Sequence, residues 1–257
     1  MTNITNTLAL LNTLTEKNSF EVLIPSLKRN VKFKPLTTKQ QKLFYSCLTD
    51  NVIYGTKFII ATYLIIKDNC YEPEIIDTLT VIDRLAILLV IRKNTLGVKL
   101  NLIKDNVLHK TSIESCLEAI NNIQIPSNET IVIKNIKLEL QTPLIADQYG
   151  VEKEVREPLI NVPSTLNSAV QDAITGEVCK VIKNVWIIEE GGEIDVQYNT
   201  LTYENKIELI ENLPAELLTE IQSYVDKINL EVAKLLTVPI DGDNIMFNIT
   251  VDFFMDS

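Results

Sequence analysis

Histidine, cysteine and clustered carboxylates are the residue types in this chain that could support catalysis or bind a metal. His109 is the single histidine, so any triad that uses an imidazole as general base depends on it, and the surrounding VLHKT matches no such motif. The four cysteines are Cys47, Cys70, Cys116 and Cys179, and they include no C-x-x-C pair. We therefore expect buried, reduced thiols instead of a zinc site or a disulfide framework.

Two acidic segments are the other candidates for site chemistry. Residues 189–195 (EEGGEID) carry four carboxylates, and two carboxylates held ~5–9 Å apart in a cleft can act as acid and base. A solvated turn is the commoner role of such a charge run, and we expect it here. Residues 241–244 (DGDN) begin like a calcium loop, but Ile245 and Met246 stand where that loop needs an oxygen ligand and a glycine. A turn is the expected structure there as well.

Composition and charge disfavour several other classes of function. The chain has seven glycines and neither of the glycine-rich phosphate-binding motifs, and its net charge of −10 repels a nucleic-acid backbone on average. Its apolar runs are far shorter than the ~20 residues that a membrane-spanning helix needs. No basic residue precedes the apolar patch of the first 20 residues, so we expect no secretory signal and synthesis in the cytoplasm. We expect no cofactor, metal, nucleic-acid partner, membrane span or enzymatic activity.

A basic segment near the start of the chain is the first candidate binding surface. Residues 20–24 and 31–33 alternate like two strands, and PSLKRN between them has the composition of a turn. Four cations follow the turn and one face of the second strand, and these candidate interface residues are Lys28, Arg29, Lys32 and Lys34. A solvated hairpin face and a docking face for an acidic partner protein are both compatible with this pattern.

The hydrophobic periodicity predicts an α+β fold with an N-terminal β-hairpin, a helical core, a β-containing middle module and a helical C-terminal part ending in a strand. Helices are expected after the Thr37–Thr38 cap, over 56–69, over 77–94 and from Pro214 onward. Residues 178–186 fit a helical face, although a strand remains open for VWII. The expected units are 1–97, 98–163 and 164–257, the last packed with the first.

The C-terminal end reads as a strand that needs a partner. Ile245, Phe247, Ile249 and Val251 alternate with polar residues, so the sequence predicts one strand over 244–254. We expect it to pair with the segments near 193–196, 23 or 31, or with another subunit. Phe253 and Phe254 are its candidate interface anchors, and deleting 244–257 is expected to leave a folded chain that no longer assembles.

Three stretches resemble a known family: IPSLKRNVKFKPLTTKQQKLF, DTLTVIDRLAILLVIRKN and a C-terminal block from VCKVIKNV to DFF. They are similar to the baseplate hub subunit, also called the hub assembly protein, of T-even-type contractile-tailed bacteriophages. Some relatives carry a cysteine pair before the final strand, where this chain has VPIDGDN. The resemblance implies a non-enzymatic structural role in the virion tail baseplate, synthesis in the host cytoplasm, other baseplate and tail proteins as partners, and self-association in a symmetric assembly as an option. The alternatives are an assembly chaperone that the virion does not retain and, more remotely, an enzyme with an unrecognised site.

Overall fold

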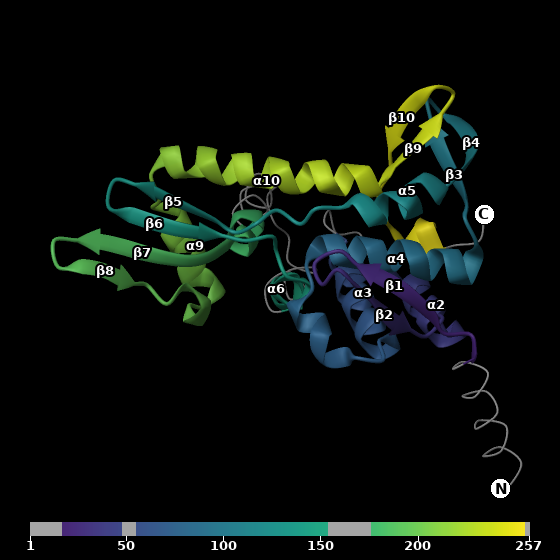
Figure 1. The fold of residues 1–257 in the computed structure, drawn as a ribbon, viewed down its shortest axis with the longest axis horizontal. Coiled ribbons are helices and arrows are strands. Elements are labelled where there is room, and N and C mark those ends of the chain that lie inside the picture. The colour runs from purple at the N-terminus through teal and green to yellow at the C-terminus, as the bar shows by residue number, and fades with distance from the viewer. Residues whose placement is uncertain (1–16, 48–54, 154–175, 255–257) are drawn as a thin grey trace, which may run out of the picture.

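The computed structural model describes residues 17–47, 55–153 and 176–254 (Figure 1). Helices and strands are both abundant, and the expected α+β class is confirmed. Helix α10 (Ala215–Leu235) runs along the molecule. A four-stranded sheet lies at one end of it and two β-hairpins lie at the other, with the N-terminal hairpin and helices beneath (Figure 1).

The N-terminal hairpin is present as expected. Strands β1 (Phe20–Ile24) and β2 (Arg29–Phe33) pair antiparallel, with Phe20 opposite Phe33 and Ile24 opposite Arg29. Lys28 takes the positive φ of 52° in the turn. One face of the hairpin is fully buried against α4 (Val81–Leu96), which leaves the face with the lysines outside.

The helical core follows the predicted pattern. Helix α2 (Thr38–Ser46) starts at a capping box between Thr37 and Gln40, and α3 (Thr56–Asn69) has the predicted bounds. Helix α4 begins later than expected, because Thr80 and Asp83 form its capping box. The preceding residues form the 3-10 helix η2 (Pro73–Thr78).

The middle of the chain forms two separate β structures. Strands β3 (Lys99–Lys104) and β4 (Val107–Ser112) make a hairpin with a two-residue turn, in which Asp105 and Asn106 both have positive φ. Helix α5 (Glu114–Ala119) and the 3-10 helix η3 (Ile120–Asn122) follow. Strands β5 (Glu129–Ile133) and β6 (Ile136–Leu140) then begin the four-stranded sheet, and α6 (Ile145–Val151) comes next.

The four-stranded sheet corrects the helix predicted over 178–186 and confirms the strand that remained open for VWII. Residues 176–181 are helical, but Ile182–Glu189 form strand β7, which pairs with β6 and with β8 (Gly192–Asp195). Ile182 and Val185 are three residues apart, and a register shift at Glu139/Leu140 allows both side chains to be buried. This spacing of buried residues resembles the spacing in a helix. Because β6 and β7 are neighbours, the sheet joins strands from both sides of the expected boundary at residue 163.

The C-terminal part ends in strands as expected, but the single strand predicted over 244–254 is wrong beyond Met246. Asp241 and Gly242, with φ of 53° and 88°, reverse the chain between β9 (Thr237–Ile240) and β10 (Asp243–Met246). These two strands form their own hairpin, so neither 193–196 nor the N-terminal hairpin pairs with this segment. Residues 247–250 belong to no helix or strand, and the described chain ends in the 3-10 helix η6 (Val251–Phe254). The elements between the sheet and α10 are the 3-10 helix η5 (Tyr198–Thr200) and α9 (Tyr203–Glu211).

Candidate protein-docking surfaces

The residue types with catalytic potential are dispersed in the structure. His109 Nδ1 lies 3.1 Å from Asp241 Oδ2, and this pair joins the β3–β4 hairpin to the β9–β10 turn. All four cysteines are buried and none forms a disulfide with another described residue, and burial raises the pKa of the Cys70, Cys116 and Cys179 thiols. In the part of the chain that the structure describes, no three His, Cys, Asp or Glu side chains are placed to hold a metal ion.

A cavity of about 760 Å³ lies among α3, α4, α10 and residues 248–251. Its lining is mainly apolar, with Arg84 as one of its charged groups. Burial lowers the pKa of Arg84 to about 10, although nearby Glu152 and Glu177 favour its charge. Arg84 donates from Nη1 to Gln148 Oε1. The cavity therefore contains a guanidinium that is already hydrogen-bonded within the chain.

A buried ion pair closes one side of this cavity. Lys180 Nζ lies 2.8 Å from Glu177 Oε1 and 3.7 Å from Glu152 Oε1. The Lys180 and Glu152 side chains are 1% and 0% exposed, and Thr56 donates from Oγ1 to Glu152 Oε2 at 2.8 Å. Because each charge has a partner, we interpret the group as a link between α3, α6 and the segment before β7.

The basic residues of the N-terminal hairpin fall into two groups. Arg29 makes a two-pronged contact with Glu72, with Nη1–Oε1 and Nη2–Oε2 distances of 3.0 and 2.6 Å. These hydrogen bonds raise the pKa of Arg29 and lower the pKa of Glu72. The charge of Arg29 is thus paired inside the chain, whereas Lys28 and Lys32 are exposed and Lys34 is half-buried.

Tyr71 completes this surface, and sequence reasoning missed it. Lys32 and Lys34 extend over the same Tyr71 ring, with their Nζ atoms 5.1 and 5.2 Å from its centroid. A β-bridge between Phe33 and Cys70 and a hydrogen bond from Tyr71 N to Lys32 O hold the ring there. No local pattern around Tyr71 signals that long-range contact. We call Lys28, Lys32, Lys34 and Tyr71 the basic face.

Phe253 and Phe254 do not form a surface. Each is 3% exposed. Phe254 stacks on Phe44, and Phe253 lies edge-on to Phe254 and under the Arg92 guanidinium. The prediction that these two rings anchor a neighbouring chain has no support in this arrangement, because the chain's own core covers both.

Exposed aliphatic side chains gather instead at the two ends of the molecule. In the four-stranded sheet, Ile187 and Ile194 are register partners and are 38% and 50% exposed. At the other end, Ile103 and Leu108 are register partners in the β3–β4 hairpin and are 75% and 59% exposed. Contiguous exposed apolar surface marks interaction sites, so we take these two pairs as candidate contacts.

Comparison with known families shows which family the chain belongs to. A model of the T4 bacteriophage base plate protein family matches residues 16–249. The chain belongs to this family. No curated protein and no solved structure matches it.

Membership in the base plate family assigns the protein to the tail baseplate of a T4-type phage, with other baseplate proteins as its partners. The expected relationship to T-even-type baseplate proteins is confirmed at this level. None of the helices that the structure describes combines the length and apolarity required to cross a bilayer.

Proposed function

We propose that this protein is a non-enzymatic structural subunit of the baseplate hub, retained in the virion, that acts by binding neighbouring tail proteins. The basic face is the observation that carries the proposal. Lys32 and Lys34 both lie over the partly exposed Tyr71 ring at the surface of a chain whose net charge is −10.

The chemistry of the basic face favours an acidic protein partner. Two ammonium groups beside one ring repel each other, and neither forms an ion pair with a described residue. A carboxylate placed between Lys32 and Lys34 would offset that repulsion. The Tyr71 ring, 38% exposed, would add apolar contact, since tyrosine is enriched among residues that dominate binding energy. Charge complementarity of this kind also orients a partner and speeds its encounter.

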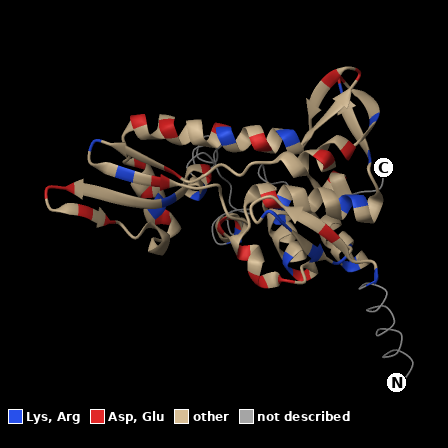
Figure 2. Ribbon diagram, viewed as in Figure 1, with Lys and Arg blue, Asp and Glu red and all other residues tan. Residues whose placement is uncertain are grey.

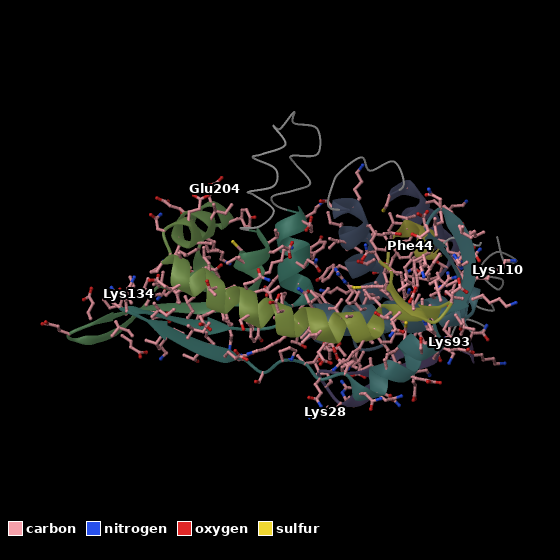
Figure 3. All side chains as sticks on the ribbon, turned by 90° about the horizontal axis from the view of Figure 1, so that it is seen from above. Lys28, Phe44, Lys93, Lys110, Lys134 and Glu204 are labelled. Atoms are coloured by element: carbon pink, nitrogen blue, oxygen red, sulfur yellow. The ribbon has the colours of Figure 1, made fainter. Side chains whose placement is uncertain are left out.

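Charge reversal on the basic face tests the proposal. The double variant Lys32→Glu/Lys34→Glu should lose co-purification with hub proteins while it keeps the thermal stability of the unchanged protein. Lys93→Glu is the control, because Lys93 is an exposed cation at the end of α4, away from Lys28 in the hairpin turn (Figure 3). Unchanged co-purification of the double variant, measured at low and high salt, would refute a docking role for this face.

Retention in the virion separates a hub subunit from an assembly chaperone. Mass spectrometry of purified particles should detect the chain at a fixed ratio to other baseplate proteins. Its presence in infected cells together with its absence from purified virions would favour the chaperone instead.

A further inference from the structure

The two ends of the molecule carry different charges next to their exposed aliphatic pairs. At the sheet end, Ile187 and Ile194 lie near Glu189, the last residue of β7, and Glu190, in the β7–β8 turn. Both glutamates are exposed and form no ion pair with a described residue, and Figure 2 shows the acidic colour at this tip. Glu193, on β8, is paired with Lys137 at 2.7 Å. We call Ile187, Glu189, Glu190 and Ile194 the acidic tip.

The opposite end has an apolar and basic face. In β3–β4, the pairs Asn101–Lys110 and Ile103–Leu108 lie on one side of the hairpin, and Lys99 continues this side. We call Lys99, Ile103, Leu108 and Lys110 the hairpin face. Both lysines are exposed, and neither forms an ion pair with a described residue. Asp105, the one acidic residue between Lys99 and Lys110, lies in the turn beyond the face.

The rest of the chain covers the other side of the same hairpin. Lys104 Nζ contacts Asp243 Oδ2 at 2.6 Å, His109 contacts Asp241, and Thr111 donates to Pro239 O at 3.3 Å. These contacts hold the β3–β4 hairpin against β9–β10. The hairpin face therefore points away from the body of the chain, and β9–β10 holds the opposite side of the β3–β4 hairpin in place.

We propose that two copies of this chain bind head to tail, with the acidic tip of one copy on the hairpin face of the next. Each surface offers one exposed aliphatic pair and two unpaired charges, and the signs of the charges are opposite. Tip-to-tip pairing would bring Glu189 and Glu190 against their own copies, so like charges oppose an isologous dimer. The two surfaces differ, and the contact is therefore heterologous.

One copy cannot satisfy both surfaces by itself. Lys134, in the turn beside the acidic tip, and Lys110, on the hairpin face, lie at opposite ends of the molecule (Figure 3). A head-to-tail contact leaves one free surface at each end of a dimer, so it continues until a ring closes or a filament grows. The edge strand β8 is unpaired on its outer side within the described sheet, which leaves backbone groups available for the next copy.

Sedimentation of the full chain over a range of concentrations tests the proposal. We expect species larger than a monomer. Either Glu189→Lys/Glu190→Lys or Lys99→Glu/Lys110→Glu should weaken self-association at least ~10-fold, because the charges of the acidic tip and the hairpin face would then have the same sign. Ile103→Ser/Leu108→Ser should weaken association equally and tests the apolar part of the contact. Leu230→Ser is the matched control, since Leu230 on α10 is 66% exposed and belongs to neither surface.

Mixing two variants distinguishes this geometry from any other. The first variant, Glu189→Lys/Glu190→Lys, keeps an intact hairpin face, and the second, Ile103→Ser/Leu108→Ser, keeps an intact tip; the altered tip and the altered hairpin face are both basic, so they do not bind each other. Each should be monomeric alone, and an equimolar mixture should stop at a one-to-one dimer. A monomeric unchanged protein, variants that associate normally, or a mixture without dimers would overturn the proposal. Since co-purification with hub proteins is a separate readout, such a result would leave the proposed hub function standing.

Discussion

The rings of Phe44 and Phe254 are stacked almost in parallel, with 4.5 Å between their centroids and 10° between their planes. Phe44 lies on α2 and Phe254 in η6, so the contact joins the first helix described to the last described residue. Phe58 on α3 packs against both rings, at 5.5 and 6.4 Å. The C-terminal segment is therefore part of the internal core.

Truncating Phe254 should destabilise the fold. Phe254→Ala should lower the free energy of unfolding by about 3–5 kcal/mol, because it removes a buried aromatic ring and leaves a cavity. Phe254→Leu, which fills more of the volume, should cost less. Urea denaturation measures both. Deletion of residues 244–257 should unfold the chain, contrary to the expectation from the sequence, and a folded deletion variant would contradict this placement of the C-terminal segment.

Arg92 links the same segment to β3. This residue is 2% exposed, and its Nη1 and Nη2 donate to Phe253 O and Lys99 O. Arg92→Met should lower the free energy of unfolding by about 2–4 kcal/mol, because two carbonyl groups lose their donor. Thermal melting measures the loss. Lys93→Met, at the neighbouring exposed position, is the control, and equal effects of the two substitutions would show that the Arg92 contacts do not stabilise the fold.

Asp83 and Arg84 should differ sharply in their contributions to stability. Asp83 is fully buried and accepts hydrogen bonds from Thr80 N, Thr80 Oγ1 and Ser26 N at 2.7, 2.8 and 2.9 Å. Asp83→Ala should cost about 2–4 kcal/mol, because it removes a helix cap and leaves a buried donor without its acceptor.

Arg84 bonds Gln148 and not Asp83, so Arg84→Met does not leave Asp83 unpaired. The loss of about 3 kcal/mol that an unpaired acid would cause is therefore not expected for this substitution. Chemical denaturation of the two variants side by side gives the comparison. A larger loss for Arg84→Met than for Asp83→Ala would contradict these assignments.

Glu139 makes stability depend on pH. Lys183, Asn184 and Asn128 donate to its carboxylate at 2.8, 3.0 and 3.2 Å, and these contacts lower its pKa, with the Lys183 hydrogen bond the largest cause. The stabilisation is thus present above the unfolded-state pKa of about 4.3 and is lost as the pH falls through the lower folded-state value.

Glu139→Gln should therefore be less stable than the unchanged protein near pH 7, and the difference should shrink below pH ~4. Thermal melts from pH 7 to pH 3 measure it. Glu190→Gln, which removes a carboxylate from the exposed β7–β8 turn, controls for the change in net charge. A difference between Glu139→Gln and the unchanged protein that stays constant with pH would contradict the assignment.

Local patterns predicted much of the fold. In the hairpin at 20–33, in α3 and in α10, the buried residues recur at the spacing of a strand or a helix, and Thr37 caps α2 as the sequence indicates. Errors arose where tertiary pairing decides. The register shift beside β7 imitates helical spacing, and the turn at Asp241–Gly242 divides an alternating run that reads as continuous.

The docking surfaces were predictable only in part. The four cations of the N-terminal hairpin follow from alternation along a strand, but the pairing of Arg29 with Glu72 and the position of Tyr71 depend on residues about 40 positions away. The two aliphatic ends likewise appear only when the sheet register is known. Sequence periodicity identifies which side chains share a face, and it does not say what covers that face.

The position of the chain in a density map of the intact tail tests the central claim most directly. The account predicts density for this chain in the baseplate hub, with the basic face, Lys28, Lys32, Lys34 and Tyr71, against an acidic surface of another tail protein. Absence of the chain from the mature tail, or a hub position in which solvent surrounds Tyr71 and its lysines, would contradict it.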